Sequence, residues 1–442
     1  RRLITKKTIA TQDFPWPLVW IAGIGTIVIL PAVIFWNFHD TGWHFALPAQ
    51  ILNGIYPPRD FAFANLQLGY HYGIDTLFAM VMALTRLRID FAVDLVTLLA
   101  WWYTLILFGL LCTRLFGERA GLLGILVGGF AGGFPWWLEA TAYVDAMQAY
   151  KVGDQFLNPS FASYFFQYPW TIGTPLLLII LILFDEFYQK KQQRLETLFA
   201  LMLSFAVLSF SNMTLFLTLS VSTVVSSTFA YLQVHLTGQG NRWRMLLLPI
   251  AMIITVIITP LLGGMFAFIF SQEQSSGAGI MFTEQGIAGN CLTNFQWNLA
   301  TFGFLLPVGL VGLLTIKSPS RWLFGLMVGG SILTLNTFEY ERTWDIVKFA
   351  TVAQILLAIA SVGVLVWLLN RTTRIFKLSA WLLGIAIVAT GLVFHLRFWL
   401  NHAHGVWLEP ALWRVSSTLP VAEDQAISWW RVSPTLTVAE GQ

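Results

Sequence analysis

Apolar residues in this chain occur in long uninterrupted runs, unlike the short periodic patterns of a soluble domain. Runs of around 20 residues recur from one end to the other, which is the length an α-helix needs to cross the hydrocarbon core of a bilayer. The strands of a membrane barrel would instead alternate apolar and polar residues over about 10 positions, and the sequence has no such alternation. The pattern predicts an all-α, polytopic membrane protein.

Eleven of these runs are predicted to cross the membrane: 17–36, 91–116, 120–139, 171–188, 196–210, 212–235, 245–270, 299–316, 321–337, 346–369 and 379–400. A twelfth apolar segment, 72–88, has polar and charged residues at both ends. We predict that it lies on the outer surface as an interfacial helix.

The distribution of charge supports this arrangement, with the N-terminus in the cytoplasm. Only 11% of the residues are charged, against about 25% in a soluble domain. With 72–88 outside, every cytoplasmic loop contains at least two basic residues, as membrane insertion favours. Most of the 22 acidic residues fall on the outer side, which insertion does not require. The skew therefore predicts a functional outer face, while the net charge of +3 is too small to predict a nucleic acid partner.

Residues 1–400 are thus expected to form one transmembrane domain, with its first outer loop at 37–90. Residues 401–442 are expected to be an outer tail, which would open a soluble domain if the natural chain continues. Cys112 and Cys291 lack metal-type spacing and are interpreted as packing residues.

The first outer loop opens with the stretch FHDTGWHF at residues 38–45. Asp40 follows a span directly, so partial desolvation would raise its pKa and suit it to act as a general base. It could equally cap a helix over 41–52. His44 and Asp60 in the same loop are further catalytic candidates. His71 and Tyr72 are candidates for substrate binding, although aromatic residues are also typical of a membrane interface.

The second outer loop contains Glu139 and Asp145 in the segment EATAYVDAMQAY. The segment is interpreted as a helix that lies on the membrane. Its two acids could bind a cation or a substrate, or they could simply form a solvated face.

Charged residues also crowd the start of the span at 346, in the segment FEYERTWDIVKFA. Arg342 and Lys348 would suit a phosphate, since a guanidinium binds two oxygens at once. Glu339 beside them is a substrate-binding candidate. The plainer alternative is a local pair between Lys348 and Asp345. Arg397, in the last turn of the final span, could bind the same phosphate or snorkel toward water.

Motifs for nucleotide binding are missing from the sequence. It has no phosphate loop, nucleotide-binding fold, nucleophile elbow or zinc motif. ATP-driven transport by this chain alone is therefore excluded.

Several segments together resemble the GT-C class of integral membrane glycosyltransferases. This superfamily includes oligosaccharyltransferase catalytic subunits, protein mannosyltransferases and aminoarabinose transferases. The segments, in chain order, are HDTGWH, YPPRDFAFANLQLGYHYGIDTLFAMVMALTRL, CTRLFGERAGLLG and FPWWLEATAYVD. TWDIVKF and AISWWRVSPT are similar to uncharacterised bacterial members of the class.

The resemblance implies that a sugar moves from a polyprenyl-phosphate donor to an acceptor on the extracytoplasmic face, with inversion at the anomeric carbon. Asp40 would act as general base or would orient the acceptor, and Asp145 or Glu139 would take the second acidic position. A tight acid-x-acid pair is missing there, so the involvement of a divalent metal stays open. Arg342, Lys348 and Arg397 would neutralise the departing lipid phosphate.

Two other functions are compatible with the sequence. A polysaccharide polymerase or ligase also uses polyprenyl-linked sugars, but it would tolerate the loss of Asp40. The second alternative is a non-catalytic membrane subunit of a larger complex that has partner membrane subunits. A secondary transporter is disfavoured, because the ionisable residues gather at one rim of the membrane instead of at its midplane.

Overall fold

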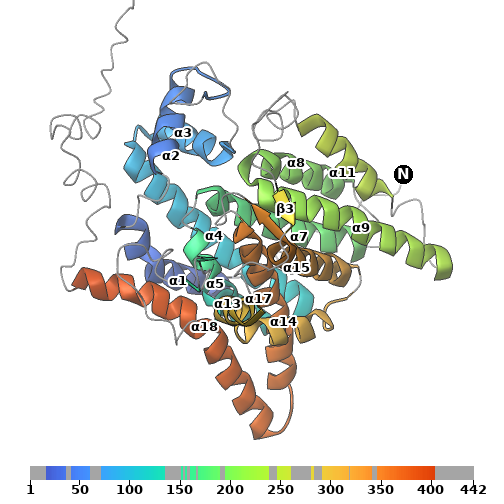
Figure 1. The fold of residues 1–442 in the computed structure, drawn as a ribbon. Coiled ribbons are helices and arrows are strands. Elements are labelled where there is room, and N and C mark those ends of the chain that lie inside the picture. Colours follow the sequence, from blue (N-terminus) through green and yellow to red (C-terminus); the bar gives the residue numbers. More distant parts are fainter. Residues whose placement is uncertain are drawn as a thin grey trace, which may run out of the picture.

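The fold is a bundle of helices, seen in a computed structural model (Figure 1). The structure describes residues 16–35, 41–59, 71–134, 151–152, 155–156, 160–165, 168–189, 195–237, 246–259, 280–282, 291–317, 319–340 and 346–403. The longest helices are α1 (Trp16–Phe35), α4 (Ile89–Phe116), α7 (Tyr168–Gln189), α9 (Met213–Thr237), α17 (Lys348–Leu369) and α18 (Arg374–Ala403).

The other helices are α2 (Thr41–Leu52), α3 (Gly73–Thr85), α5 (Ala120–Phe130), α6 (Phe161–Phe165), α8 (Leu195–Ser211), α11 (Leu247–Ile258), α13 (Cys291–Phe302), α14 (Leu305–Leu313) and α15 (Ser320–Thr337). Within the described residues, four short strands form two antiparallel pairs: β1 (Lys151–Val152) with β2 (Gln155–Phe156), and β3 (Ile280–Phe282) with β4 (Phe338–Tyr340). Helices therefore make up nearly all of the regular structure that is described, as the sequence predicts.

Within the described residues, six helices are long and apolar enough to cross a membrane. A seventh span arises if α13 and α14, which meet at an angle of 71°, are counted as one broken span. Each of the eleven predicted spans overlaps a helix of the structure, but α5, α8 and α11 are shorter than a full crossing. The protein is an integral membrane protein, and the count of eleven stays a prediction.

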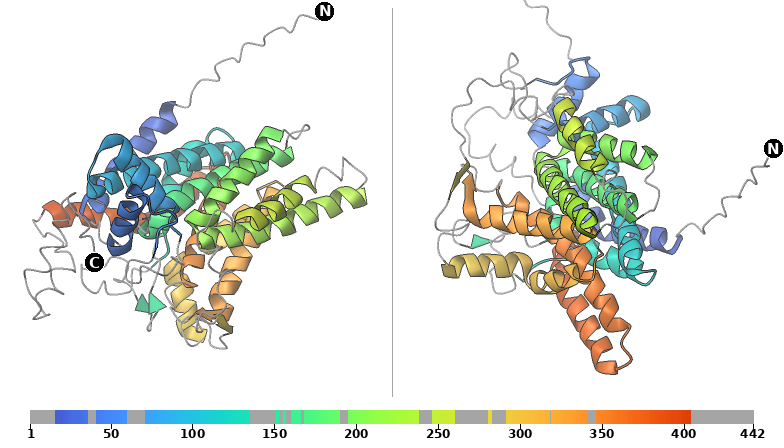
Figure 2. Two further views of the ribbon diagram at one scale, coloured as in Figure 1. Left: turned by 90° about the horizontal axis from the view of Figure 1, so that it is seen from above. Right: turned by 90° about the vertical axis from the view of Figure 1, so that its right-hand side faces the viewer.

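Helix α17 lies at the centre of the bundle, with α5, α14 and α15 around it (Figure 1). Close contact with α14 depends on Gly312, since a Cβ there would collide with the carbonyl of Ala360. Helices α17 and α18 form a hairpin whose tip extends away from the bundle (Figures 1 and 2). The core therefore places the first turn of α17 inside the protein and its last turn at the periphery.

Helix α5 ends at Phe130, earlier than the predicted span 120–139. The pair Gly132-Gly133 follows the C-cap residue Ala131, and glycine disfavours the helical conformation. The backbone that leaves the helix stays paired: the N–H of Gly132 donates to the carbonyl of Ile387 over 3.0 Å, and the hydroxyl of Thr390 donates to the carbonyl of Gly133 over 2.7 Å. Such pairing is what allows non-helical backbone inside a membrane domain.

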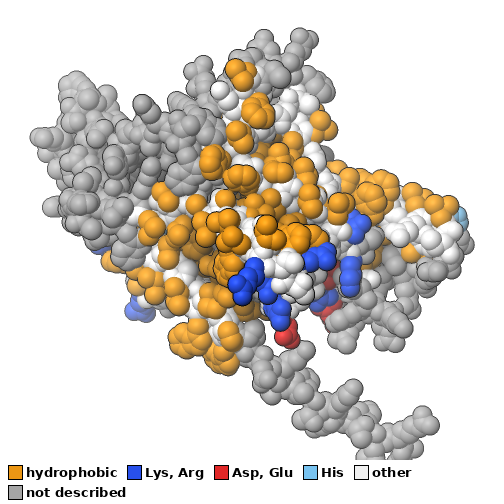
Figure 3. All heavy atoms as spheres, turned by 90° about the horizontal axis from the view of Figure 1, so that it is seen from below, with side chains coloured by type: hydrophobic (Ala, Val, Ile, Leu, Met, Phe, Trp, Pro, Cys, Tyr) orange, Lys and Arg blue, Asp and Glu red, His pale blue; other side chains and the backbone are white. Residues whose placement is uncertain are grey.

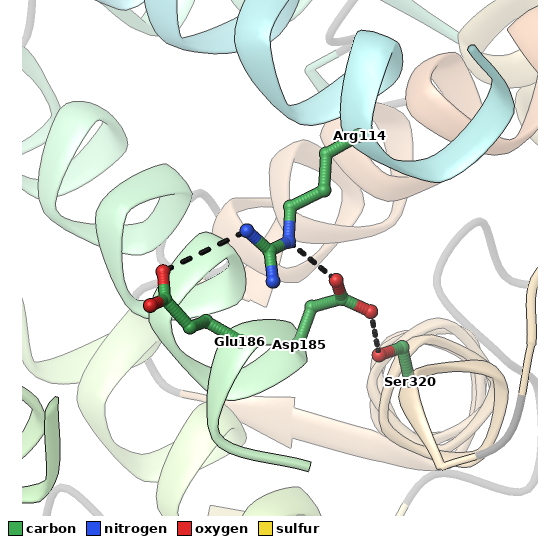
Figure 4. Close-up of polar contacts among 4 residues, drawn as sticks. All are labelled: Arg114, Asp185, Glu186 and Ser320. Atoms are coloured by element: carbon green, nitrogen blue, oxygen red, sulfur yellow. Dashed lines mark hydrogen bonds and ion pairs between the residues drawn. The ribbon is translucent and has the colours of Figure 1, made fainter. Parts of the chain in front are cut away.

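Three helix ends that are predicted to face the cytoplasm meet around one buried carboxylate (Figure 4). Nε of Arg114, near the end of α4, donates to Asp185 on α7 over 2.5 Å. The hydroxyl of Ser320, at the start of α15, donates to the other oxygen of Asp185 over 2.9 Å. Glu186 lies 3.6 Å from the same guanidinium. Asp185 is only 2% exposed, so this opposite charge and these hydrogen bonds offset the cost of burying it.

Two further contacts join segments that are predicted to lie on the same side of the membrane. The guanidinium of Arg119, in the loop between α4 and α5, donates to Asn370, in the loop between α17 and α18. At the other end, β3 pairs with β4, and both belong to predicted outer segments. These two contacts agree with the predicted grouping of the loops, while the topology and the orientation in the membrane stay predictions.

Candidate functional site

Helix α2 and the first turn of α3 pack together at the end of the bundle that is predicted to be outer. The position of α3 depends on Gly73, its first residue, because a Cβ there would collide with the Ser211 side chain at the end of α8. The first turns of α7 and α17 reach the same region. Four elements from distant parts of the chain thus supply the side chains of this site.

The centre of the site is a buried pair formed by His44 on α2 and Asp75 on α3. The Nδ1 atom of His44 lies 2.7 Å from Oδ1 of Asp75, and both side chains are 0% exposed. When the carboxylate is ionised, the imidazole Nδ1–H donates, since an ionised carboxylate can only accept. Asp75 is the third residue of its helix, where the partial positive charge of a helix N-terminus favours an anion. The other oxygen, Oδ2, has no hydrogen-bond partner within the described part of the chain.

The surroundings of this pair alter the chemistry of the carboxyl group. Burial raises the pKa of Asp75, and the neighbouring imidazole of His44 acts in the opposite direction. The ring of Tyr168 meets the His44 ring edge-on, with centroids 4.8 Å apart. The ring of Phe78 in turn meets the ring of Tyr168 edge-on, with centroids 5.5 Å apart. Aromatic rings and the carboxylate together fix the position of the imidazole.

His71 and Lys348 belong to the same polar cluster. Burial lowers the pKa of His71 well below its usual value, and the positive charge of Lys348, together with that of His44 whenever its ring is protonated, lowers it further. His71 is only 8% exposed. The cluster therefore combines a neutral imidazole, a cation at the start of α17 and the buried pair of His44 with Asp75.

Lowering the pH below about 6.5, the usual pKa of histidine, is expected to destabilise the folded protein through His71. The unfolded chain takes up a proton near that pH, whereas the folded chain resists it because the pKa of His71 is lowered. The free energy of unfolding therefore falls as the pH drops from 6.5 toward the folded pKa. The thermal unfolding midpoint in detergent, followed from pH 7.5 to 5.0, measures this loss. The variant His71→Asn is expected to show a shallower slope, and an unchanged slope would contradict the assignment to His71.

Four of the predicted site residues come together in this cluster. His44 was predicted to be catalytic, Lys348 to bind the donor phosphate, and His71 and Tyr72 to bind substrate; Tyr72 is 1% exposed and packs on Phe210. Sequence reasoning missed Asp75 as a site residue. The signal that could have found it was a carboxylate at the start of an apolar helix, an expensive position near a bilayer.

The other predicted site residues are not placed in this way. Asp40, Asp60, Glu139, Asp145 and Arg342 lie outside the described residues. The backbone of Glu339 is in the middle of β4, opposite Met281, and the backbone of Arg397 is in α18. The side chains of these two residues are outside what the structure describes.

A metal ion is not assigned to this site. Where the structure describes the chain, no group of three or more His, Cys, Asp and Glu side chains has the arrangement of a metal site. Because the acids predicted for the second outer loop lie outside that part, the involvement of a divalent metal stays open.

No protein-family model and no curated protein sequence matches this chain. Solved structures of an Archaeoglobus fulgidus oligosaccharyltransferase, however, are similar in fold. One, tethered with an acceptor peptide containing the NVT sequon, matches over 86% of this chain with a TM-score of 0.50 and 11% identity. The fold is that of the GT-C oligosaccharyltransferases. A second structure, the oligosaccharyltransferase AglB of the same organism with an inhibitory peptide and a dolichol-phosphate, matches over 86% of this chain with a TM-score of 0.50 and 12% identity.

The predicted GT-C fold is thereby confirmed for the membrane domain. This chain covers 55% of each of the two oligosaccharyltransferase chains, so it spans about half of their length. At 11–12% identity the similarity concerns the fold, and the chemistry of this chain has to be argued from its own residues.

Proposed function

We propose that this protein is a membrane glycosyltransferase that transfers a sugar from a polyprenyl-phosphate donor to an acceptor on the extracytoplasmic face. The observation that supports it is a buried pair, His44 with Asp75, that shares one end of a GT-C fold with the cation Lys348. One of the similar oligosaccharyltransferase structures contains a dolichol-phosphate, which is a polyprenyl-type lipid phosphate. A base and a cation are the two groups that transfer from such a donor requires.

Lys348 is proposed to neutralise the phosphate of the donor. It is the first residue of α17, where the N-terminus of the helix adds partial positive charge. His71, kept neutral by its lowered pKa, can donate a ring N–H to a phosphate oxygen without adding a charge. Arg342 and Arg397 are proposed to contact the same phosphate. Negative charge builds on the phosphate as it leaves, so these groups stabilise the transition state more than the bound donor.

His44 is proposed to take up the proton of the acceptor. A hydrogen bond from Nδ1–H to Asp75 leaves Nε2 as the basic atom. The acceptor atom forms a bond to the anomeric carbon, and its proton moves to the base. The bond from this carbon to the phosphate oxygen breaks, and the phosphate leaves with the electron pair. Attack opposite the leaving phosphate gives inversion.

The acids of the outer loops are proposed to assist at the acceptor. Asp40 lies four residues before His44 in the chain, and it either orients the acceptor toward His44 or accepts the proton itself. Asp60 is proposed to act beside it. Asp145 or Glu139 is proposed for the second acidic position. With the isoprenoid in the bilayer and its phosphate at the interface, acids at the rim of a span would reach the anomeric carbon without extraction of the lipid.

Transfer from radiolabelled polyprenyl-phosphate sugars in membranes tests this function. The intact protein is expected to transfer sugar, and Asp40→Asn is expected to lower the rate about a hundredfold if Asp40 is the base. The matched control is Asp90→Asn at the start of α4, whose carboxylate forms a partly exposed pair with Arg88 and is expected to matter little.

The other outcomes separate the competing functions. Transfer that survives Asp40→Asn while His44→Gln abolishes it assigns the proton transfer to His44. Transfer that survives both changes moves the chemistry elsewhere and favours a polymerase or ligase. A folded protein that transfers no sugar from any donor tried contradicts the enzymatic function and favours a non-catalytic subunit.

A further inference from the structure

The far end of α17, away from Lys348, carries a second distinctive surface. We define the basic hairpin as residues 367–382, which comprise the last turn of α17, the connecting turn and the first turns of α18. Every residue from 371 to 379 is exposed. The views agree that this tip extends away from the rest of the bundle (Figures 1 and 2).

One face of the basic hairpin is apolar and exposed on the protein surface. Ile375, Leu378 and Leu382 are 69%, 58% and 60% exposed. They follow one another at intervals of three and four residues, so they form one stripe along α18. Such a stripe on a membrane protein is stable against the apolar part of a bilayer. The stripe therefore sets the depth of the hairpin at the edge of the hydrocarbon region.

Cations are interleaved with this stripe at the same depth. Arg371, Arg374 and Lys377 lie within seven residues, and the sequence from 346 to 408 contains no Asp or Glu. Arg119 adds a fourth positive charge, because its guanidinium donates to Asn370 over 3.0 Å. Seen from below in Figure 3, Lys and Arg side chains gather beside a broad hydrophobic surface. The region thus has a concentrated positive charge at the level of lipid headgroups.

Three of these cations, Arg371, Arg374 and Lys377, have no carboxylate within ion-pair distance in the described part of the chain. Arg374 and Lys377 also stand in the first turn of α18, where the helix dipole disfavours positive charge. An anion beside them would remove both unfavourable effects.

Aromatic side chains hold the hairpin in a shape that suits an interface. The guanidinium of Arg371 lies 4.3 Å from the ring centroid of Trp367, a contact that orients it at little cost in water. Phe376 packs edge-on against the same indole, 6.3 Å away. Trp367 and Trp381 are 47% and 58% exposed, and tryptophan prefers the headgroup level of a membrane.

We propose that the basic hairpin is a binding surface for anionic phospholipids of the adjacent leaflet. The arginines and Lys377 would contact the headgroup phosphates, while Ile375, Leu378 and Leu382 contact the acyl chains. Both features are needed, since the cations select the charge of the headgroup and the apolar stripe selects a lipid over a soluble phosphate. This proposal does not depend on the proposed function of the protein.

Lipid-dependent thermal stability of the purified protein in a neutral detergent tests the proposal. Phosphatidylglycerol is expected to raise the unfolding midpoint more than phosphatidylcholine with the same acyl chains, because a ligand that binds the folded state stabilises it. The triple variant Arg371→Gln, Arg374→Gln and Lys377→Gln is expected to need about a hundredfold more phosphatidylglycerol for half of the effect, given the contribution of each cation near anionic lipid.

A matched control removes the same charge from another loop that is predicted to lie at the same end. The variant Lys190→Gln, Lys191→Gln and Arg194→Gln is expected to respond to phosphatidylglycerol as the original protein does. An equal loss in this control, or an equal gain from phosphatidylcholine in the original protein, would overturn the proposal. The variant Arg371→Lys with Arg374→Lys keeps the charge and is expected to keep most of the response. It shows whether substitution at these positions alone, without loss of charge, disturbs the fold.

Discussion

Asp75→Asn is expected to lower sugar transfer by about 1,000- to 10,000-fold and to leave the protein folded, since loss of the orienting acid of a catalytic histidine has effects of this size. Asparagine has almost the same shape, so the packing of α3 against α2 survives. Its amide group can donate to Nδ1 of His44, and the imidazole proton would then move to Nε2. The proposed base would lose the lone pair that accepts the proton of the acceptor. Initial rates of transfer, together with the thermal unfolding midpoint, measure the two effects separately.

The companion variants distinguish a catalytic pair from a structural one. If His44 and Asp75 act as a unit, the double variant His44→Gln with Asp75→Asn should be no slower than the slower single variant. Asp75→Ala should instead destabilise the protein by about 3–5 kcal/mol, because it removes one partner of a buried pair. Full transfer by Asp75→Asn, or single effects that multiply in the double variant, would show that the pair has no joint role in catalysis.

The sequence was sufficient to predict the fold class, while the side of the membrane on which each loop lies stays a prediction. Apolar runs of membrane-spanning length give helices directly, and the contact of Arg119 with Asn370 agrees with two basic loops lying at the same end of the bundle. Helix ends were harder to predict. The span 120–139 was drawn through the Gly-Gly pair that ends α5, because hydropathy responds to apolar character and not to the conformational freedom of glycine.

The neighbours within the candidate site could not be predicted, for a related reason. His71 and Lys348 were both expected at the outer rim, but the pattern of apolar runs does not say which helices pack side by side. In the sequence, Asp75 is one polar residue at the end of a predicted interfacial helix. In the structure, Gly73 allows α3 to pack closely against α8, and the carboxylate of Asp75 contacts His44. Such contacts depend on packing between distant segments.

Lys348→Gln is expected to lower kcat/KM for a polyprenyl-phosphate sugar by about 100- to 1000-fold, the usual effect of removing a group that stabilises charge in a transition state. Lys348→Arg retains the positive charge and is expected to stay within about tenfold of the original rate. Lys317→Gln, at an exposed position in the loop between α14 and α15, is the matched control and is expected to leave transfer unchanged. Transfer rates at several donor concentrations measure the effect.

The same variant has a second readout that does not require catalysis. Lys348 is one cause of the lowered pKa of His71, so its removal should raise that pKa toward the usual value. The difference in proton affinity between the folded and unfolded chains then shrinks, and the loss of stability below pH 6.5 becomes shallower. A shallower slope with unchanged transfer would leave Lys348 beside His71 but place the donor phosphate elsewhere. If both change together, the cation that acts on His71 is also the one that acts on the donor.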